Sequence, residues 1–200
     1  MPDHPERARN VIAERFRLVL LLIALAAVAW PLMMLLHEVG HLLAAWLTGG
    51  SVGRLVWHPL VFSRTEVFPN PHPLVVVWAG PVVGCLLPLG AERLMAWRWP
   101  NVAYLGQAVA GFCLIANGAY IGLGWIDDVG DAGDMLFYGT PAWVMVAFGL
   151  VAVVAGFYLW HLASGRRPGP RKVVTRHVIV VVALAMVVNA VGLLFGDAGH

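Results

Sequence analysis

The sequence predicts an all-α polytopic membrane protein with about five transmembrane helices, because long apolar runs alternate with short polar segments. Hydrophobic residues make up 60% of the 200 residues and charged residues 12%, and the mean hydropathy is +0.78. Soluble domains carry about twice that share of charge. The expected spans cover residues 18–48, 74–95, 102–125, 141–162 and 178–195.

The segment before the first span, residues 1–17, is polar and rich in arginine. We expect a cytoplasmic lead-in and not a signal peptide, because the apolar run that follows is too long and has no clear small-residue cleavage site. Residues 18–200 then form one membrane-embedded domain, in the cell membrane. The formal net charge of +2 is too small to indicate nucleic-acid binding, so the lipid bilayer is the expected surrounding.

The first span is longer than a bilayer core requires, at about 46 Å of helix. Pro31 is expected to kink it, because proline removes the hydrogen bond to Ala27. From the last arginine of the lead-in to His37 the helix rises about 30 Å, which places His37 near the membrane face opposite the N-terminus. Gly49-Gly50 ends the helix.

Near that face the span contains His37-Glu38-Val39-Gly40-His41, which reads H-E-x-x-H. Histidines at i and i+4 lie one turn apart on one helix face, so their ring nitrogens can converge on one metal ion. Glu38 borders that face and can serve as the base for a metal-bound water. The motif is typical of zinc peptidases, here with one zinc ion per chain. The alternative, three buried ionisable groups that satisfy one another, is costly inside an apolar span.

A catalytic zinc site uses three protein ligands and an open position, and H-E-x-x-H supplies two of them. Residues 127–134 offer candidates for the third ligand, since four aspartates and no basic residue lie there. We expect Asp127 and Asp128 to belong to a solvated acidic loop. Either Asp131 or Asp134 is then the remaining metal ligand.

Residues 51–72 alternate partly between apolar and polar side chains. This pattern predicts a weak β-hairpin that dips into the membrane interface near the metal and turns at Ser63-Arg64-Thr65. An exposed edge of such a hairpin can hold an extended substrate by strand addition. An ordinary interfacial loop is the alternative.

Three residues within the other spans are of interest for a site or for a disulfide: Asn117, Cys85 and Cys113. Asn117 is a candidate substrate-binding residue, although an asparagine at membrane depth more often bonds another helix. Cys85 and Cys113 both lie in apolar runs, so we expect small buried hydrophobes and no disulfide framework.

The distribution of basic residues predicts the topology. Eleven of the thirteen Lys and Arg residues lie in segments 1–17, 93–100 and 163–177, which five spans place on one side of the membrane. By the positive-inside rule this side is cytoplasmic. The same threading places the end of the first span and the acidic segment on the opposite, outer face, so the two histidines and the Asp131 region can meet.

These motifs resemble those of the site-2 protease family of intramembrane zinc metalloproteases, the M50 class of peptidases, over roughly residues 30–137. Residues 79–84, A-G-P-V-V-G, are similar to the family's A-G-P-x-x-N, with Gly84 in the place of the asparagine. Residues 130–136, G-D-A-G-D-M-L, are similar to its L-D-G-G-x-x-L, with Ala132 in the place of the first glycine. The resemblance implies Asp131 as the third ligand, with Asp134 in reserve, and matches Asn117 to an upstream asparagine of the family.

The resemblance further implies hydrolysis of a peptide bond in or near a transmembrane segment of a client membrane protein. His37, His41 and Asp131 would hold zinc, and Glu38 would act as the general base. Two features depart from the family. The chain has no room for the PDZ or CBS domain that many members carry, and the family's zinc site usually opens toward the cytosol, whereas the charge distribution places this one toward the outer face.

Two other functions fit the same residues. A catalytically inactive membrane scaffold, which binds a partner protein, would explain the altered motifs at Gly84 and Ala132. A metal-ion transporter or sensor would use the histidines and the acidic segment for metal passage or detection. The sequence specifies neither the client protein nor an oligomeric state.

Overall fold

The fold is a bundle of long helices, seen in a computed structural model that describes residues 4–165 and 175–195. Within these residues, five helices are long and apolar enough to cross a membrane, as the sequence predicts. They are α1 (His4–Leu47), α2 (Pro73–Arg98), α3 (Ala103–Gly124), α5 (Ala142–Gly165) and α6 (Thr175–Phe195). The shorter elements are β1 (Val52–His58), β2 (Val61–Val67), the 3₁₀ helix η1 (Pro100–Val102) and α4 (Gly130–Phe137).

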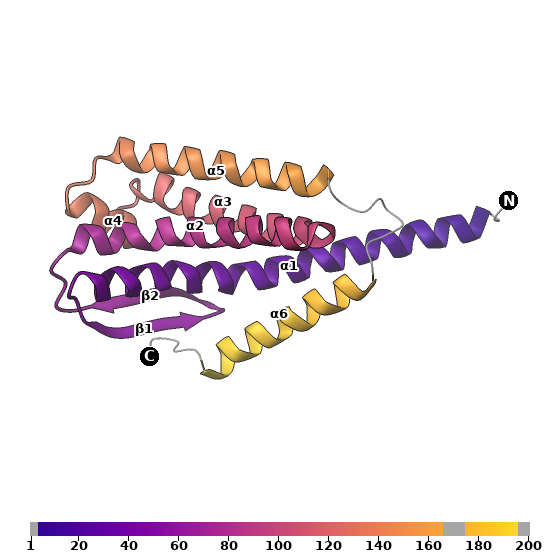
Figure 1. Cartoon of the computed structure of the whole chain (residues 1–200), viewed down its shortest axis with the longest axis horizontal. Coiled ribbons are helices and arrows are strands. Elements are labelled where there is room, and N and C mark those ends of the chain that lie inside the picture. Colours follow the sequence, from indigo (N-terminus) through magenta and orange to yellow (C-terminus); the bar gives the residue numbers. More distant parts are fainter. Residues whose placement is uncertain (1–3, 166–174, 196–200) are drawn as a thin grey trace.

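The longest helix, α1, runs through the middle of the bundle (Figure 1). α2, α3 and α5 lie on one side of α1, and the two strands and α6 lie on the other. The N-terminal part of α1 extends beyond the other helices, so from His4 onward the lead-in and the first span form one continuous helix. α4 lies at the opposite end of the bundle, where α1 ends and α2 begins.

Small residues let α3 and α5 approach closely. A methyl group added at Gly149 would lie 2.6 Å from the Cα of Gly122 and 2.7 Å from the carbonyl oxygen of Gly118. Such contacts are typical of helix pairs in membranes, where association depends on close packing more than on the hydrophobic effect. Cys85 and Cys113 are buried free thiols, as expected.

α1 continues through Pro31 as one unbroken helix, although this proline donates no hydrogen bond to Ala27. The carbonyl oxygen of Ala27 instead accepts a hydrogen bond from Asn189 Nδ2 on α6, at 2.8 Å. The carbonyl of Pro31 accepts another from Trp57 Nε1 on β1, at 3.0 Å. An unsatisfied carbonyl is costly in a bilayer. The proline therefore marks the place where α6 and the strands attach to α1.

The predicted hairpin forms from β1 and β2, but its turn lies elsewhere than expected. The turn is at Pro59-Leu60, and Ser63-Arg64-Thr65 lies within β2. The physical reason is that proline has no N–H to donate to a strand ladder, so it favours the end of a strand.

The hairpin runs back along α1, away from the end of the helix at Leu47 (Figure 1). Trp30 Nε1 donates a hydrogen bond of 3.0 Å to the carbonyl of Pro59 in the turn. Trp30 lies about 25 Å along the helix from its end at Leu47. The turn is thus at the depth of the span, and the strands pass the level of the H-E-x-x-H motif on the way.

Replacing Asn189 by leucine is expected to lower the free energy of unfolding by about 0.6–1.7 kcal/mol, as for other hydrogen bonds between membrane helices. The same replacement should cost less in a Pro31→Ala background, because an alanine N–H again satisfies the Ala27 carbonyl. Unfolding in detergent by titration with SDS measures both costs. Equal costs in the two backgrounds would contradict this role for Asn189.

Candidate metal centre

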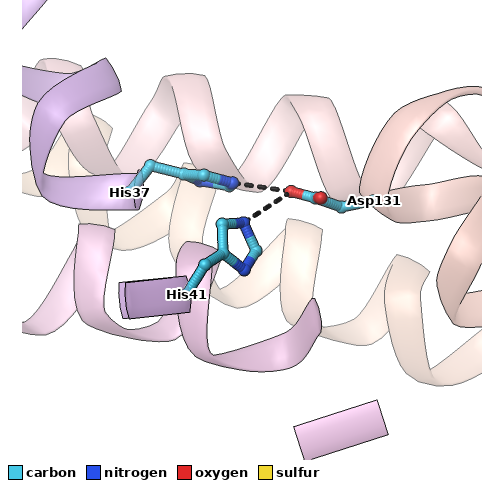
Figure 2. A group of neighbouring side chains, drawn as sticks. All are labelled: His37, His41 and Asp131. Atoms are coloured by element: carbon cyan, nitrogen blue, oxygen red, sulfur yellow. Dashed lines mark hydrogen bonds and ion pairs between the residues drawn. The ribbon is translucent and has the colours of Figure 1, made fainter. Parts of the chain in front are cut away.

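Two elements far apart in sequence bring three metal-ligating groups together. α1 supplies His37 and His41, and the first turn of α4 supplies Asp131 (Figure 2). One ligand atom from each of the three residues lies within 4.8 Å of the other two. Asp131 Oδ2 is 2.6 Å from His37 Nε2 and 3.3 Å from His41 Nε2. Both histidines are buried, so the cluster is largely shielded from the surroundings.

Hydrogen bonds behind the two imidazoles determine which ring nitrogen faces Asp131. His41 Nδ1 is 2.8 Å from the carbonyl oxygen of Val76, which can only accept a hydrogen bond. His37 Nδ1 is 2.7 Å from Asn117 Oδ1, and the amide of Asn117 is oriented by its own bond to the carbonyl of Cys113 at 2.9 Å. Both Nδ1 atoms therefore donate, and each neutral ring presents the lone pair of Nε2 to the cluster.

The donor set fits a metal ion. Two imidazole lone pairs and a carboxylate oxygen point at one another, and such acceptors repel unless a proton or a cation lies between them. Catalytic zinc sites use three protein ligands, drawn from His, Asp, Glu and Cys, and keep a fourth position open. Two histidines and one aspartate fit this description. Ligand atoms of a tetrahedral zinc ion lie about 3.3 Å apart. The separation of His41 Nε2 from Asp131 Oδ2, 3.3 Å, is of that size, whereas 2.6 Å at His37 is a hydrogen-bond distance.

The carboxyl group of Asp131 is held in the charged form that a metal ligand requires. Burial raises its pKa, but a proton held between the carboxylate and Nε2 of His37 or His41 outweighs burial and leaves the pKa well below its usual range. Tyr120 Oη accepts a 3.0 Å hydrogen bond from the backbone N–H of Asp131 and so holds the first turn of α4 in place. The Tyr120 ring also packs edge-on against His37, at 5.9 Å between centroids.

Two glycines make room for the imidazoles by letting α1 and α2 approach closely. A methyl group added at Gly80 on α2 would collide with His41 Nε2 and would lie 2.8 Å from His37 Nε2. A methyl group at Gly40 on α1 would overlap the backbone of Ala79 and lie 2.8 Å from the Cα of Gly80. Position 80 in the A-G-P stretch therefore requires a glycine for steric reasons, because any side chain there would collide with the imidazoles.

Local packing accounts for the residues at positions 84 and 132, where the chain differs from the motifs that it resembles. A methyl group at Gly84 would lie 3.0 Å from Asn117 Nδ2 and 3.1 Å from Asn117 Oδ1, so the side chain from α3 fills the space of a longer residue at 84. Ala132 is fully buried beside Gly124, in a cluster with Ile121 and Met135. Its methyl group anchors α4 to α3.

The acidic segment differs in part from the expected loop, because α4 begins at Gly130 and contains Asp131 and Asp134. Positive φ angles of 53° at Asp128 and 60° at Gly130 turn the chain into this helix. In the described part of the chain, Asp131 belongs to the metal-ligating cluster and Asp134 does not. Asp134 follows Asp131 by three residues, nearly one turn further along α4, so sequence spacing alone left both open.

Sequence reasoning predicted that His37, His41 and the Asp131 region can meet, and the structure brings these three together. Asn117 contacts His37, and its role toward a substrate stays a prediction. Two contributors were missed: Tyr120, and Thr65, whose Oγ1 donates a 2.6 Å hydrogen bond to Glu38 Oε2. The sequence contained a signal for Tyr120. It follows Asn117 by three residues, so the two side chains lie on the same face of a helix and Tyr120 could have been expected near the site.

No protein-family model, curated protein or solved structure matches this chain. What the chain does is therefore inferred from its own residues and their geometry.

Substituting single ligands should reveal the metal centre. We expect about one zinc per chain in detergent-purified protein, lost with His41→Ala and Asp131→Ala, because each removes one of three ligands. Asp134→Ala should retain the metal, and it is the matched control. Elemental analysis of the folded, chelator-free variants measures the stoichiometry. Retention in Asp131→Ala together with loss in Asp134→Ala would identify the other aspartate as the ligand.

Gly80→Ala is expected to weaken metal binding by about 10- to 100-fold, the usual effect of disturbing groups that support metal ligands. The added methyl group displaces the imidazoles, whose nitrogens occupy its place. Gly90→Ala is the control on the same helix, since a methyl group there meets no heavy atom within 4 Å. Competition with a chromophoric chelator gives the two affinities, and equal affinities would contradict the steric role of Gly80.

Proposed function

We propose that this protein is an intramembrane zinc metalloprotease, which hydrolyses a peptide bond in or near a transmembrane segment of a client membrane protein. The observation that carries the proposal is the pairing of a His37–His41–Asp131 cluster with a buried glutamate, Glu38, on a helix apolar enough to span a membrane. Ionisable groups at such depth are functional candidates, because burying them without a task is costly.

His37, His41 and Asp131 would hold the zinc ion, through two Nε2 atoms and Oδ2. When bound, zinc supplies Lewis acidity, which activates water and polarises the carbonyl of the scissile bond. Asn117 and the carbonyl of Val76 keep the imidazoles in the tautomer that binds metal.

Glu38 is proposed to move the proton. Glu38 is only 2% exposed, so few water molecules compete for its carboxylate. Oε2 accepts the hydrogen bond of Thr65, and the second oxygen is the one that takes the proton from the attacking water. Glu38 then passes this proton to the leaving amine, which completes the hydrolysis of the peptide bond.

The proposed substrate is a membrane protein whose helix unwinds locally. Helical carbonyls are bonded within the helix, so one of them must be released before it can reach the metal. The sheet consists of β1 and β2 alone, so each strand pairs with the other along one edge and has a second, outer edge. Backbone groups need hydrogen-bond partners at the depth of a membrane span. An unwound substrate segment would gain such partners by pairing with an outer edge of the hairpin as an additional strand.

The scaffold alternative draws its support from Gly84 and Ala132. Both departures have a packing reason in this chain, since Asn117 fills the space beside Gly84 and Ala132 is buried against Gly124. They are therefore weak signs of lost catalysis, and the protease proposal is the stronger one.

Glu38→Gln is expected to retain zinc and to lower cleavage by about 10²-fold or more, because the amide cannot accept the proton. The probe is a panel of fluorogenic single-span peptides reconstituted with the protein in liposomes, with products identified by mass spectrometry. Glu14→Gln, the same change in the N-terminal part of α1, is the control. Full cleavage by the Glu38 variant would contradict the mechanism. Partner binding that survives the substitution, with no cleavage by the parent, would favour the scaffold.

A further inference from the structure

A single side-chain hydrogen bond links the hairpin to the H-E-x-x-H motif. Thr65 Oγ1 on β2 lies 2.6 Å from Glu38 Oε2 on α1. A carboxylate accepts and the hydroxyl donates, and a bond to a charged acceptor is among the stronger hydrogen bonds in proteins. None of the three metal-ligating side chains takes part in this contact.

The strand geometry directs Thr65 toward α1. Burial alternates along β2: Thr65 and Val67 are partly buried, while Arg64 and Glu66 are exposed. Val67 packs against the cluster of Ala44 and Ala45 near the end of α1. Neighbouring side chains in a strand point to opposite faces, so Thr65 shares the buried face with Val67.

The hairpin is attached to α1 on both sides of this contact. At the turn, Trp30 Nε1 donates to the carbonyl of Pro59, and Trp57 Nε1 donates to the carbonyl of Pro31, both at 3.0 Å. At the open end, Val67 of β2 packs against Ala44 and Ala45 of α1. The strand ladder between these attachments leaves the hydroxyl of Thr65 little freedom of position.

Glu38 needs such a fixed partner. A glutamate side chain has several rotatable bonds, and a general base must lie within hydrogen-bond reach of the proton it takes. A buried carboxylate oxygen without a donor would also be unfavourable. The hydroxyl meets both needs, because it satisfies Oε2 and fixes the plane of the carboxylate.

We propose that Thr65 is a positioning residue for the general base, through which the docked hairpin holds Glu38 in its reactive orientation. The inference rests on the proposed protease function and deepens it. The element proposed to bind the unwound substrate is then also the element that orients the base. Undocking of the hairpin from α1 would release Glu38 and stop cleavage while the metal stays bound.

Thr65→Val and Thr65→Ser test the role. Valine keeps the shape and removes the hydroxyl, so kcat for the fluorogenic single-span peptides should fall about 10- to 100-fold, as for other small misplacements of catalytic groups. KM and zinc content should stay close to those of the parent, and serine should restore most of kcat. Thr48→Val is the matched control, since among the described residues the Thr48 hydroxyl bonds to the carbonyls of Ala44 and Ala45, within its own helix turn. An unchanged kcat in Thr65→Val, or a rise in KM alone, would overturn the positioning role.

A double-mutant cycle supplies a readout that does not depend on activity. Thr65→Val should lower the melting temperature by a few degrees in the parent and by clearly less in a Glu38→Ala background, where the hydroxyl has lost its partner. Equal shifts in both backgrounds would overturn the proposed contact. Loss of cleavage in Glu38→Gln with full cleavage in Thr65→Val rejects this inference and leaves the protease function standing. A parent that cleaves none of the peptides rejects both.

Discussion

The close approach of α1 and α2 is the constraint on which the candidate site depends. Gly40 and Gly80 allow the two backbones to meet, and the space beside them is filled by the imidazoles of His37 and His41. The same approach brings the carbonyl of Val76 within 2.8 Å of His41 Nδ1. One packing contact therefore gives the histidines their position and helps to give them their tautomer, and a side chain at either glycine would disturb both.

Satisfaction of polar groups at the depth of the spans explains much of the remaining architecture. The proline in α1 leaves the Ala27 carbonyl without its helical donor, and Asn189 of α6 supplies one. Tryptophan side chains attach the hairpin to α1 through carbonyls at Pro31 and Pro59. In a lipid environment each such group needs a partner within the protein. The irregular parts of the chain are consequently bonded to the helix that carries the metal motif, and Thr65 reaches Glu38 as part of that arrangement.

Much of the fold was predictable because membrane spans leave a strong local signal. Long apolar runs gave the five helices, and partial alternation gave the hairpin. The turn was misplaced because Ser63-Arg64-Thr65 has polar side chains typical of turns, while ladder pairing with β1 keeps these residues in a strand. α4 was missed because it has only eight residues, and its stability comes from burial of Ala132 and Met135 against α3.

The sequence by itself determined the helical membrane fold and the pair His37 and His41 with Glu38 beside them, since helical periodicity alone places these residues on adjoining faces. It narrowed the third ligand to two aspartates. Tertiary structure decided that Asp131 joins the cluster, that Asn117 and Val76 orient the imidazoles, and that Thr65 contacts Glu38. These contacts join residues 27 to 94 positions apart, and no local pattern encodes which side chains meet when separate elements pack.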